Sequence, residues 1–191
     1  PNGELYIGGS FSSLGGVSAS RIASWNGSTF SALGSGANGT VSALEWFSNK
    51  LIVGGDFESA GGNSNARRVA AWNGAVWSNL SIGISGSIEG IQSVSCLIDA
   101  GNGTLLVGGL FDLANVSHGL GVWNGSGWTS AWTATLGGGV PSVSSLLKLP
   151  NGDLIAAGFF DSVNSNPASN IARRDHVSGT WSALGSGLQG N

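Results

Sequence analysis

The sequence is poor in charge and has almost no cysteine. Only 9% of its 191 residues are charged, and the formal net charge at pH 7 is −3. Without a basic patch, nucleic acid is not an expected partner. A single cysteine, Cys96, excludes an internal disulfide framework and a cysteine-based zinc site. Because Cys96 lies among small and apolar residues, we expect a core side chain whose ionisation is disfavoured.

Long apolar runs and helical patterns are also missing. No apolar stretch reaches the length that crosses a bilayer, so we predict no membrane-spanning segment. No segment combines helical spacing of apolar residues with capping residues. Glycine is abundant instead, with 34 residues, and it alternates with strand-length runs of Leu, Ile, Val, Phe and Trp. That alternation predicts a folded β-structure, not a disordered low-complexity chain.

Two motifs recur along the chain. The first, Leu-x-Ile/Val-Gly-Gly-x-Phe, occupies residues 5–11, 51–57 and 105–111, with a looser copy at 154–160. The second, Ile/Val-Ala-x-Trp-Asn-Gly, follows it at 22–27 and 69–74, with shorter or degenerate copies at 121–125 and 171–175. A period of about 50 residues built from short strands is typical of a β-propeller.

Each tryptophan of the second motif is followed five positions later by another aromatic residue. The pairs are Trp25 with Phe30, Trp72 with Trp77, and Trp123 with Trp128. Asn-Gly between them is a strong hairpin signal, because such a turn needs positive φ at its centre. We therefore predict that the two aromatic residues of each pair face each other across a hairpin.

A glycine-rich exit and a Val-x-x-Leu strand complete each repeat. That strand occurs at residues 41–44, 94–97 and 143–146. Four short strands per unit predict an all-β fold, a β-propeller built from four-stranded antiparallel blades of about 48 residues, with about four blades here. We expect one propeller region over residues 1–191, within a longer natural chain. Its repeats are approximately 1–48, 49–99, 100–149 and 150–191.

These motifs resemble the kelch and delta-60 type of propeller repeat, including the repeats of extracellular fungal cell-polarity marker proteins. The resemblance covers all four repeats. It implies an extracellular or cell-surface propeller with a scaffold or adhesive role, and it does not imply an enzyme. Some kelch-type propellers, such as galactose oxidase, carry a copper site. Its Tyr, His and Cys ligands have no counterparts here, where Tyr6 is the one tyrosine.

Acidic residues follow the recurring phenylalanine in three copies. They are Glu58, Asp112 and Asp161. If the blades surround an axis, these carboxylates form a partial ring, which suits a hard cation such as calcium. The alternative is that they are solvated or pair with arginines a short way downstream. Those arginines are Arg21, Arg68 and Arg173.

No catalytic residue or cofactor site is predicted. Residues 34–39 and 185–190 match Gly-x-Gly-x-x-Gly, but a phosphate-binding loop of that type must open a helix. Both segments precede a strand position of the repeat, so we expect loops between blades. His118 and His176 occupy non-equivalent loop positions, and no nucleophile motif accompanies either of them.

Two further sets of residues are candidates for modification or sugar binding. Trp46 and Trp132 fall outside the repeat pattern, so the core does not demand them, and we consider them for stacking against a ligand. Asn-x-Ser/Thr sequons are candidates for N-glycosylation. They lie at Asn26, Asn38, Asn79, Asn102, Asn115 and Asn124, of which the first and last fall inside predicted hairpin turns.

We expect a non-enzymatic, secreted glycoprotein: an extracellular structural or adhesive β-propeller scaffold at the cell surface, and a component of a surface assembly or filament. Its expected partners are other proteins, copies of itself, and cell-surface or matrix glycans. One alternative is a carbohydrate-binding, lectin-like propeller. Another is the propeller portion of a larger secreted enzyme whose active residues lie elsewhere.

Overall fold

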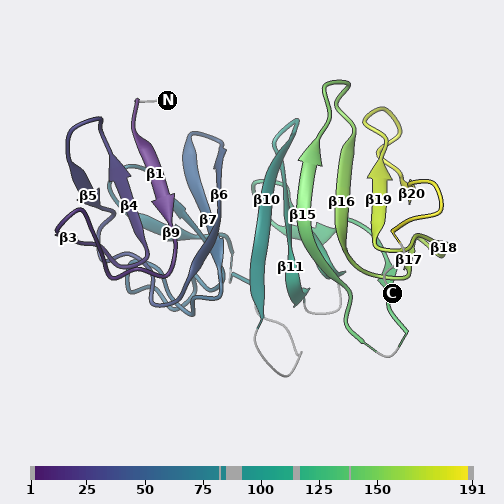
Figure 1. Ribbon diagram of the computed structural model, residues 1–191, viewed down its shortest axis with the longest axis horizontal. Coiled ribbons are helices and arrows are strands. Elements are labelled where there is room, and N and C mark those ends of the chain that lie inside the picture. Colours follow the sequence, from purple (N-terminus) through teal and green to yellow (C-terminus); the bar gives the residue numbers. More distant parts are fainter. Residues whose placement is uncertain (1–2, 82, 85–91, 114–116, 138, 189–191) are drawn as a thin grey trace. The chain divides into compact units, whose positions relative to one another are not determined.

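The computed structural model describes residues 3–81, 83–84, 92–113, 117–137 and 139–188 (Figure 1). All regular secondary structure in these residues is β-strand, as predicted. A search of the same residues for helices long and apolar enough to span a membrane finds none. The chain forms two compact units, residues 1–84 and 85–191.

The first unit contains two antiparallel sheets, which we call the first and second blades. The first blade has strand order β1 (Leu5–Gly8), β4 (Ile22–Trp25), β5 (Phe30–Ala32). The second has the order β6 (Val41–Phe47), β7 (Lys50–Gly55), β8 (Val69–Trp72), β9 (Trp77–Asn79). A small hairpin, β2 (Ser13–Leu14) with β3 (Val17–Ser18), is inserted between β1 and β4.

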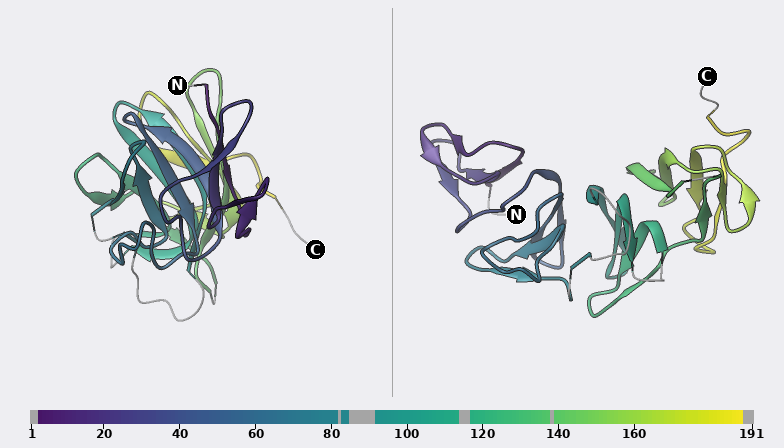
Figure 2. Two further views of the ribbon diagram at one scale, coloured as in Figure 1. Left: turned by 90° about the vertical axis from the view of Figure 1, so that its left-hand side faces the viewer. Right: turned by 90° about the horizontal axis from the view of Figure 1, so that it is seen from below.

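The second unit contains two four-stranded antiparallel sheets, the third and fourth blades (Figures 1 and 2). The third has the order β10 (Ser93–Gly101), β11 (Thr104–Leu113), β12 (Ser117–Trp123), β13 (Trp128–Ser130). The fourth has the order β15 (Ser142–Lys148), β16 (Leu154–Phe159), β19 (Ile171–Arg174), β20 (Trp181–Ala183). A small sheet is formed by β14 (Ala134–Thr135), β17 (Ser162–Val163) and β18 (Asn166–Pro167).

The boundaries of the sheets are offset by one strand from the boundaries of the sequence repeats, which are 1–48, 49–99, 100–149 and 150–191. The Val-x-x-Leu strand ends each of the first three sequence repeats, yet it opens the sheet of the following blade, as β6 does with β7. The cause is local. Ser48 and Asn49 form a two-residue turn with φ of 50° and 60°, and this turn joins Phe47 directly to its partner Lys50.

The Gly-Gly pair of the first motif allows close approach on two sides. A side chain at Gly8 would collide with Val41 of the next blade, and a Cβ at Gly108 would lie 2.9 Å from Val143 Cγ1. A Cβ at the following glycine would meet a backbone carbonyl at the β-bulge of the neighbouring strand, as Gly109 shows against Ser93. The first glycine therefore leaves room for a side chain of the adjacent blade, and the second leaves room for the β-bulge of the neighbouring strand.

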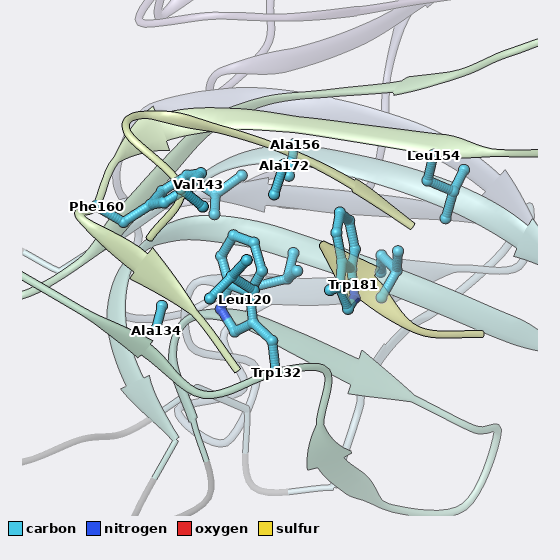
Figure 3. Close-up of a cluster of buried hydrophobic side chains, with 12 residues drawn as sticks. Leu120, Trp132, Ala134, Val143, Leu154, Ala156, Phe160, Ala172 and Trp181 are labelled. Carbon is cyan, nitrogen blue, oxygen red and sulfur yellow. The ribbon is translucent and has the colours of Figure 1, made fainter. Parts of the chain in front are cut away.

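The recurring phenylalanine anchors the core. Phe57, Phe111 and Phe160 are completely buried, and burial of such a ring stabilises a fold by about 1.5–3 kcal/mol. In the second unit, one hydrophobic cluster runs from Leu120 of the third blade to Phe160 and Trp181 of the fourth (Figure 3). Neighbouring blades within a unit thus share a core.

Candidate functional site

The predicted aromatic pairs are present at the outer hairpins. Trp25 is the cross-strand partner of Phe30, with ring centroids 4.4 Å apart. The same pairing joins Trp72 to Trp77 at 5.3 Å and Trp123 to Trp128 at 5.2 Å. In the fourth blade, an arginine, Arg174, lies opposite Trp181. Each hairpin therefore carries an aromatic side chain, and three carry a pair.

The turns of these hairpins differ from the tight Asn-Gly turn that was predicted. The loops of the first three blades have four residues each, and in the first blade only Gly27 has positive φ, at 97°. The asparagine acts through its side chain, because Asn26 Oδ1 accepts hydrogen bonds from the amides of Ser28 and Thr29, both at 2.9 Å. The tight turn occurs instead at Asn102-Gly103, with φ of 53° and 71°.

The residue just before the second motif adopts left-handed backbone geometry in all four blades. Arg21, Arg68, Gly119 and Asn170 have φ of 65°, 59°, 72° and 64°. In the second blade the Arg68 amide donates to the Phe57 carbonyl at 2.8 Å, and the Arg68 carbonyl accepts from the Gly55 amide at 2.9 Å. These bonds bring the loop beside the residue that follows the recurring phenylalanine.

Glu58 is paired with arginines across that loop. Its carboxylate contacts Arg67 at 2.5 Å and Arg68 at 2.7 Å, and Arg68 also donates to the Ile84 carbonyl at 3.0 Å. Burial lowers the pKa of the Arg68 guanidinium, and the nearby Glu58 carboxylate opposes that shift. For Glu58, the structure thus matches the alternative of pairing with a downstream arginine.

The other two acidic candidates also have partners near at hand. The buried Asp112 carboxylate lies 3.6 Å from His118 Nδ1. Asp161 accepts a hydrogen bond from the Gly137 amide at 2.8 Å. Among the residues that the structure places, no three His, Cys, Asp or Glu side chains gather as a potential metal site. Calcium binding by these acidic residues stays a prediction.

A cavity of about 250 Å³ opens beside His118. Its walls come mainly from the exit segment of the third blade, the stretch between β13 and β15, and include Ala134, Leu136, Val140 and Pro141. The lining is mainly apolar, with one imidazole that is half exposed. The cavity has room for a small molecule or one sugar unit. Nothing in the repeat pattern pointed to it, because the lining residues lie outside both motifs.

A buried polar cluster in the fourth blade was also missed. Asp153 is 1% exposed. Its carboxylate accepts from Arg173 Nε at 2.8 Å and from Asn151 Nδ2 at 2.7 Å, and it lies 2.9 Å from His176 Nδ1. The hydrogen bonds from His176, with those from Asn151 and Arg173, hold the pKa of Asp153 well below its ordinary value. The cluster ties the β15–β16 turn to the β19–β20 turn.

The two tryptophans proposed for ligand stacking have different environments. Trp132 is 3% exposed and packs against Phe160 and Trp181 (Figure 3). The stacking prediction for Trp132 is therefore wrong: it lies in the exit segment of its blade, where the buried Leu33 lies in the first blade. Trp46 is partly exposed, with its ring 6.3 Å from that of Tyr6, and it remains a candidate.

The sequons fall in three structural settings. Asn26 and Asn124 are committed to turn hydrogen bonds, and Asn79 Nδ2 donates to the Ser81 carbonyl. Asn38 uses its Oδ1 as an acceptor. Asn102 is exposed at the tip of the β10–β11 hairpin. Asn115 lies outside the described residues. Glycosylation at all six positions stays a prediction.

Cys96 has the environment expected of a core residue. Its side chain packs against the core of the second unit, and Sγ lies 3.8 Å from the Val143 carbonyl oxygen. Burial raises the pKa of the Cys96 thiol to about 12. At neutral pH the reactive thiolate is therefore scarce.

The repeated meanders, the shared cores and the recurring bulges define a β-propeller repeat domain. A family model described as "Domain of unknown function (DUF5122) beta-propeller" matches residues 1–23 and 149–173. Both matched segments contain the first motif and the start of the second. A search of curated proteins gives no match. The partial family match and the sheets agree on the β-propeller.

Proposed function

We propose that this β-propeller is a non-enzymatic extracellular scaffold with a structural or adhesive role, as its resemblance to kelch-type surface propellers implies. The observation that carries the proposal is a latch between neighbouring blades within each unit. The exit segment of a blade follows its last strand, β5 in the first blade and β13 in the third. It is hydrogen-bonded to the insertion of the next blade, which lies between β7 and β8 in the second blade and between β16 and β19 in the fourth. Such a latch stiffens a repeat array, which is what a scaffold requires.

In the first unit, Asn38 forms the latch. Its side-chain Oδ1 accepts hydrogen bonds from the backbone amides of Glu58 and Ser59 at 2.8 and 2.9 Å. The backbone amide of Asn38 donates to the Ser59 carbonyl at 3.1 Å. An isolated bridge between Ala37 and Ala60 lies beside these bonds. One asparagine side chain thus fixes the exit of the first blade to the second blade.

In the second unit, the same connection is built with the roles reversed. The asparagine, Asn164, belongs to the insertion, and its Oδ1 accepts from the Thr133 amide of the exit segment at 3.1 Å. The Asn164 amide donates to the Thr133 carbonyl at 2.7 Å, and the Asp161 amide donates to the Thr135 carbonyl at 2.8 Å. The exit segment and the next blade's insertion are therefore hydrogen-bonded in both units, but different residues form the bonds.

The charged side chains support a structural use as well. Glu58 with its arginines, and Asp153 with Arg173 and His176, hold loops within single blades. The chain is rich in Ser, Thr and Asn, whose side chains both donate and accept hydrogen bonds, which suits contact with the hydroxyl groups of matrix glycans.

Electron microscopy of the native material, with antibody labelling of intact cells, tests this proposal. We expect labelling of intact, unpermeabilised cells and propellers that recur along a surface layer or fibre. Labelling only after permeabilisation, with dispersed single particles, would overturn both the location and the structural role. A preparation treated with surface protease is the control, because it must lose the signal.

A carbohydrate-binding role is the second candidate, favoured by the partly exposed Trp46 beside Tyr6 and by the cavity at His118. A sugar face stacks on an exposed indole. Glycan-array binding that disappears in Trp46→Ala and survives in Trp46→Phe would support it. Equal binding by the wild type and Trp46→Ala would remove Trp46 from consideration.

A further inference from the structure

In three blades the exit segment closes onto its own blade through a backbone hydrogen bond. The acceptor is the carbonyl of the residue that precedes the left-handed position, and the donor is an amide of the exit segment. These bonds join Ala37 to Ser20, Ile84 to Arg67 and Leu188 to Ser169, at 3.1, 3.1 and 2.7 Å. The exit chain of these blades therefore lies directly against the residue that accepts the bond.

The third blade makes the corresponding closure with a side chain. Trp132, labelled in Figure 3, donates from its indole Nε1 to the carbonyl of His118 at 3.3 Å. The exit chain meets the same place again at Pro141, whose carbonyl oxygen would lie 2.7 Å from a Cβ at Gly119. Residues between Trp132 and Pro141 line the cavity of about 250 Å³ beside His118. The cavity thus lies where this exit chain departs from the pattern of the other blades.

One wall of the cavity is fixed to the fourth blade. Strand β14, which contains the lining residues Ala134 and Thr135, pairs with β17. The Thr135 and Ser162 hydroxyl groups lie 2.6 Å apart across this pairing. A wall held in this way keeps its shape before any ligand arrives, which is usual for sites that bind small molecules.

His118 takes the place that Arg67 has in the second blade. Both precede the left-handed position, and their acidic partners, Asp112 and Glu58, both follow the recurring phenylalanine. The Asp112 side chain is 8% exposed and lies 3.6 Å from His118 Nδ1. Arginine is always charged, whereas a neutral imidazole presents one donor and one acceptor nitrogen. The third blade therefore places a hydrogen-bonding ring, and not a fixed charge, at the cavity.

The lining limits the ligand to a small molecule of low polarity. An apolar cavity of about 150 Å³ admits benzene, so this one has room for a ring with a substituent. Of the described residues that line it, only His118 and Thr135 have side chains that form hydrogen bonds, and Thr135 is engaged with Ser162. A sugar has several hydroxyl groups, and each one that is buried without a partner is costly. A single polar group on the ligand matches the single imidazole.

A charged ligand is disfavoured at this cavity. A charge among apolar side chains needs a partner of opposite sign. The charge pair at the cavity, His118 with Asp112, is internal to the protein. An added carboxylate would face the Asp112 carboxylate across one imidazole, and an added ammonium would compete with that imidazole for Asp112.

We propose that the cavity lined by His118, Leu136, Val140 and Pro141 binds a small uncharged molecule with an apolar ring or branched chain and one hydroxyl or carbonyl group. His118 forms the hydrogen bond to that group, and the apolar walls cover the rest of the molecule. Such a site is independent of the scaffold role and takes a ligand other than a sugar.

Binding of 4-methylphenol to the folded chain tests the site, with toluene as the matched molecule that lacks the hydroxyl group. Saturation-transfer NMR or calorimetric titration at neutral pH measures the affinities. We expect saturable binding of 4-methylphenol with a Kd of about 1 mM or below. Toluene should bind about fivefold more weakly, which is the effect of one hydrogen bond. Methyl glucoside and 4-methylbenzoate should bind at least about tenfold more weakly than 4-methylphenol.

Two substitutions locate the binding. His118→Phe keeps a ring but removes the hydrogen-bonding nitrogen atoms, so 4-methylphenol should fall to the affinity of toluene while toluene binds as before. Val140→Phe narrows the cavity and should weaken both ligands at least about tenfold. Val177→Phe is the matched control, because Val177 is 81% exposed in the β19–β20 turn, and it should change neither affinity. Thermal unfolding confirms that each variant is folded.

Three results overturn the proposal. The first is the absence of saturable binding for both 4-methylphenol and toluene in the wild type, a result that needs no variant. The second is tighter binding of methyl glucoside than of 4-methylphenol, which would return the cavity to the carbohydrate candidate. The third is unchanged binding in folded His118→Phe and Val140→Phe, which would place the bound molecule elsewhere on the chain.

Discussion

The indole of Trp132 meets the ring of Phe160 edge-on, with ring centroids 5.0 Å apart. Trp132 belongs to the exit segment of the third blade, and Phe160 is the recurring phenylalanine of the fourth. The exit segment therefore contributes to the core of the next blade as well as to the latch. This relationship makes the connection between blades part of the hydrophobic core.

Trp132→Ala should lower the free energy of unfolding by about 3–5 kcal/mol, because it leaves a large cavity in a shared core. Trp46→Ala is the matched control, and it should cost about 1 kcal/mol because Trp46 is only partly buried. Urea titrations followed by circular dichroism measure both losses. Equal losses in the two variants would contradict the assignment of Trp132 to the core.

Gly36→Ala should destabilise the chain more than Gly34→Ala. Both glycines have positive φ, at 68° and 58°, so each substitution has a backbone cost of about 1 kcal/mol. A Cβ at Gly36 would also collide with the Ser20 carbonyl, whereas one at Gly34 comes no closer than 3.4 Å to any neighbour. We expect an additional loss of about 1–3 kcal/mol at Gly36. Thermal unfolding of the two variants tests the difference, and similar melting temperatures would disprove it.

Asn73→Ala should lower the free energy of unfolding by about 1 kcal/mol, because Asn73 Oδ1 accepts from the amides of Ala75 and Val76. Asn73→Asp keeps an acceptor oxygen at the same place and should cost much less. Equilibrium unfolding in urea compares the two. A full loss in Asn73→Asp would show that the Nδ2 group, and not Oδ1, holds the turn.

Asp153 should make stability fall at acid pH. Its pKa in the folded state lies below the ordinary value of 3.8, so the unfolded state binds the proton first as the pH falls. The contribution is therefore fully present above about pH 5 and is lost progressively as the pH drops below about 4. Unfolding midpoints measured from about pH 6 to about pH 2 should show a shallower acid decline in Asp153→Asn than in the wild type.

Asp56→Asn is the control for that series, because Asp56 is an exposed carboxylate outside the cluster. It should reproduce the wild-type pH dependence. An acid decline in Asp153→Asn as steep as that of the wild type would assign the pH dependence to other carboxylates.

The features that recur with the repeat period are the ones that the sequence predicts. The antiparallel sheets return with a period of about 50 residues, and the aromatic hairpin pair returns in the first three, so the pairing of Trp25 with Phe30 follows from the sequence pattern. The stacking prediction for Trp132 fails because the exit segment of the third repeat is longer than that of the first, so the repeat pattern offers no buried counterpart from which the burial of Trp132 could be predicted. The Asp153 cluster depends on register between two turns, although Arg173 at a position that is small or apolar in the other copies was a usable signal.

The one-strand offset between sheets and sequence repeats bears on how such a chain can grow or shrink. Any stretch one period long contains every strand type once, wherever it is cut. A tandem duplication that is one period long therefore adds one whole blade wherever it begins, since the displaced opening strand is supplied by the preceding copy. Unequal recombination between equivalent positions of two repeats changes the number of blades by whole units, and length variation between alleles in steps of one period is the genetic trace that this architecture predicts.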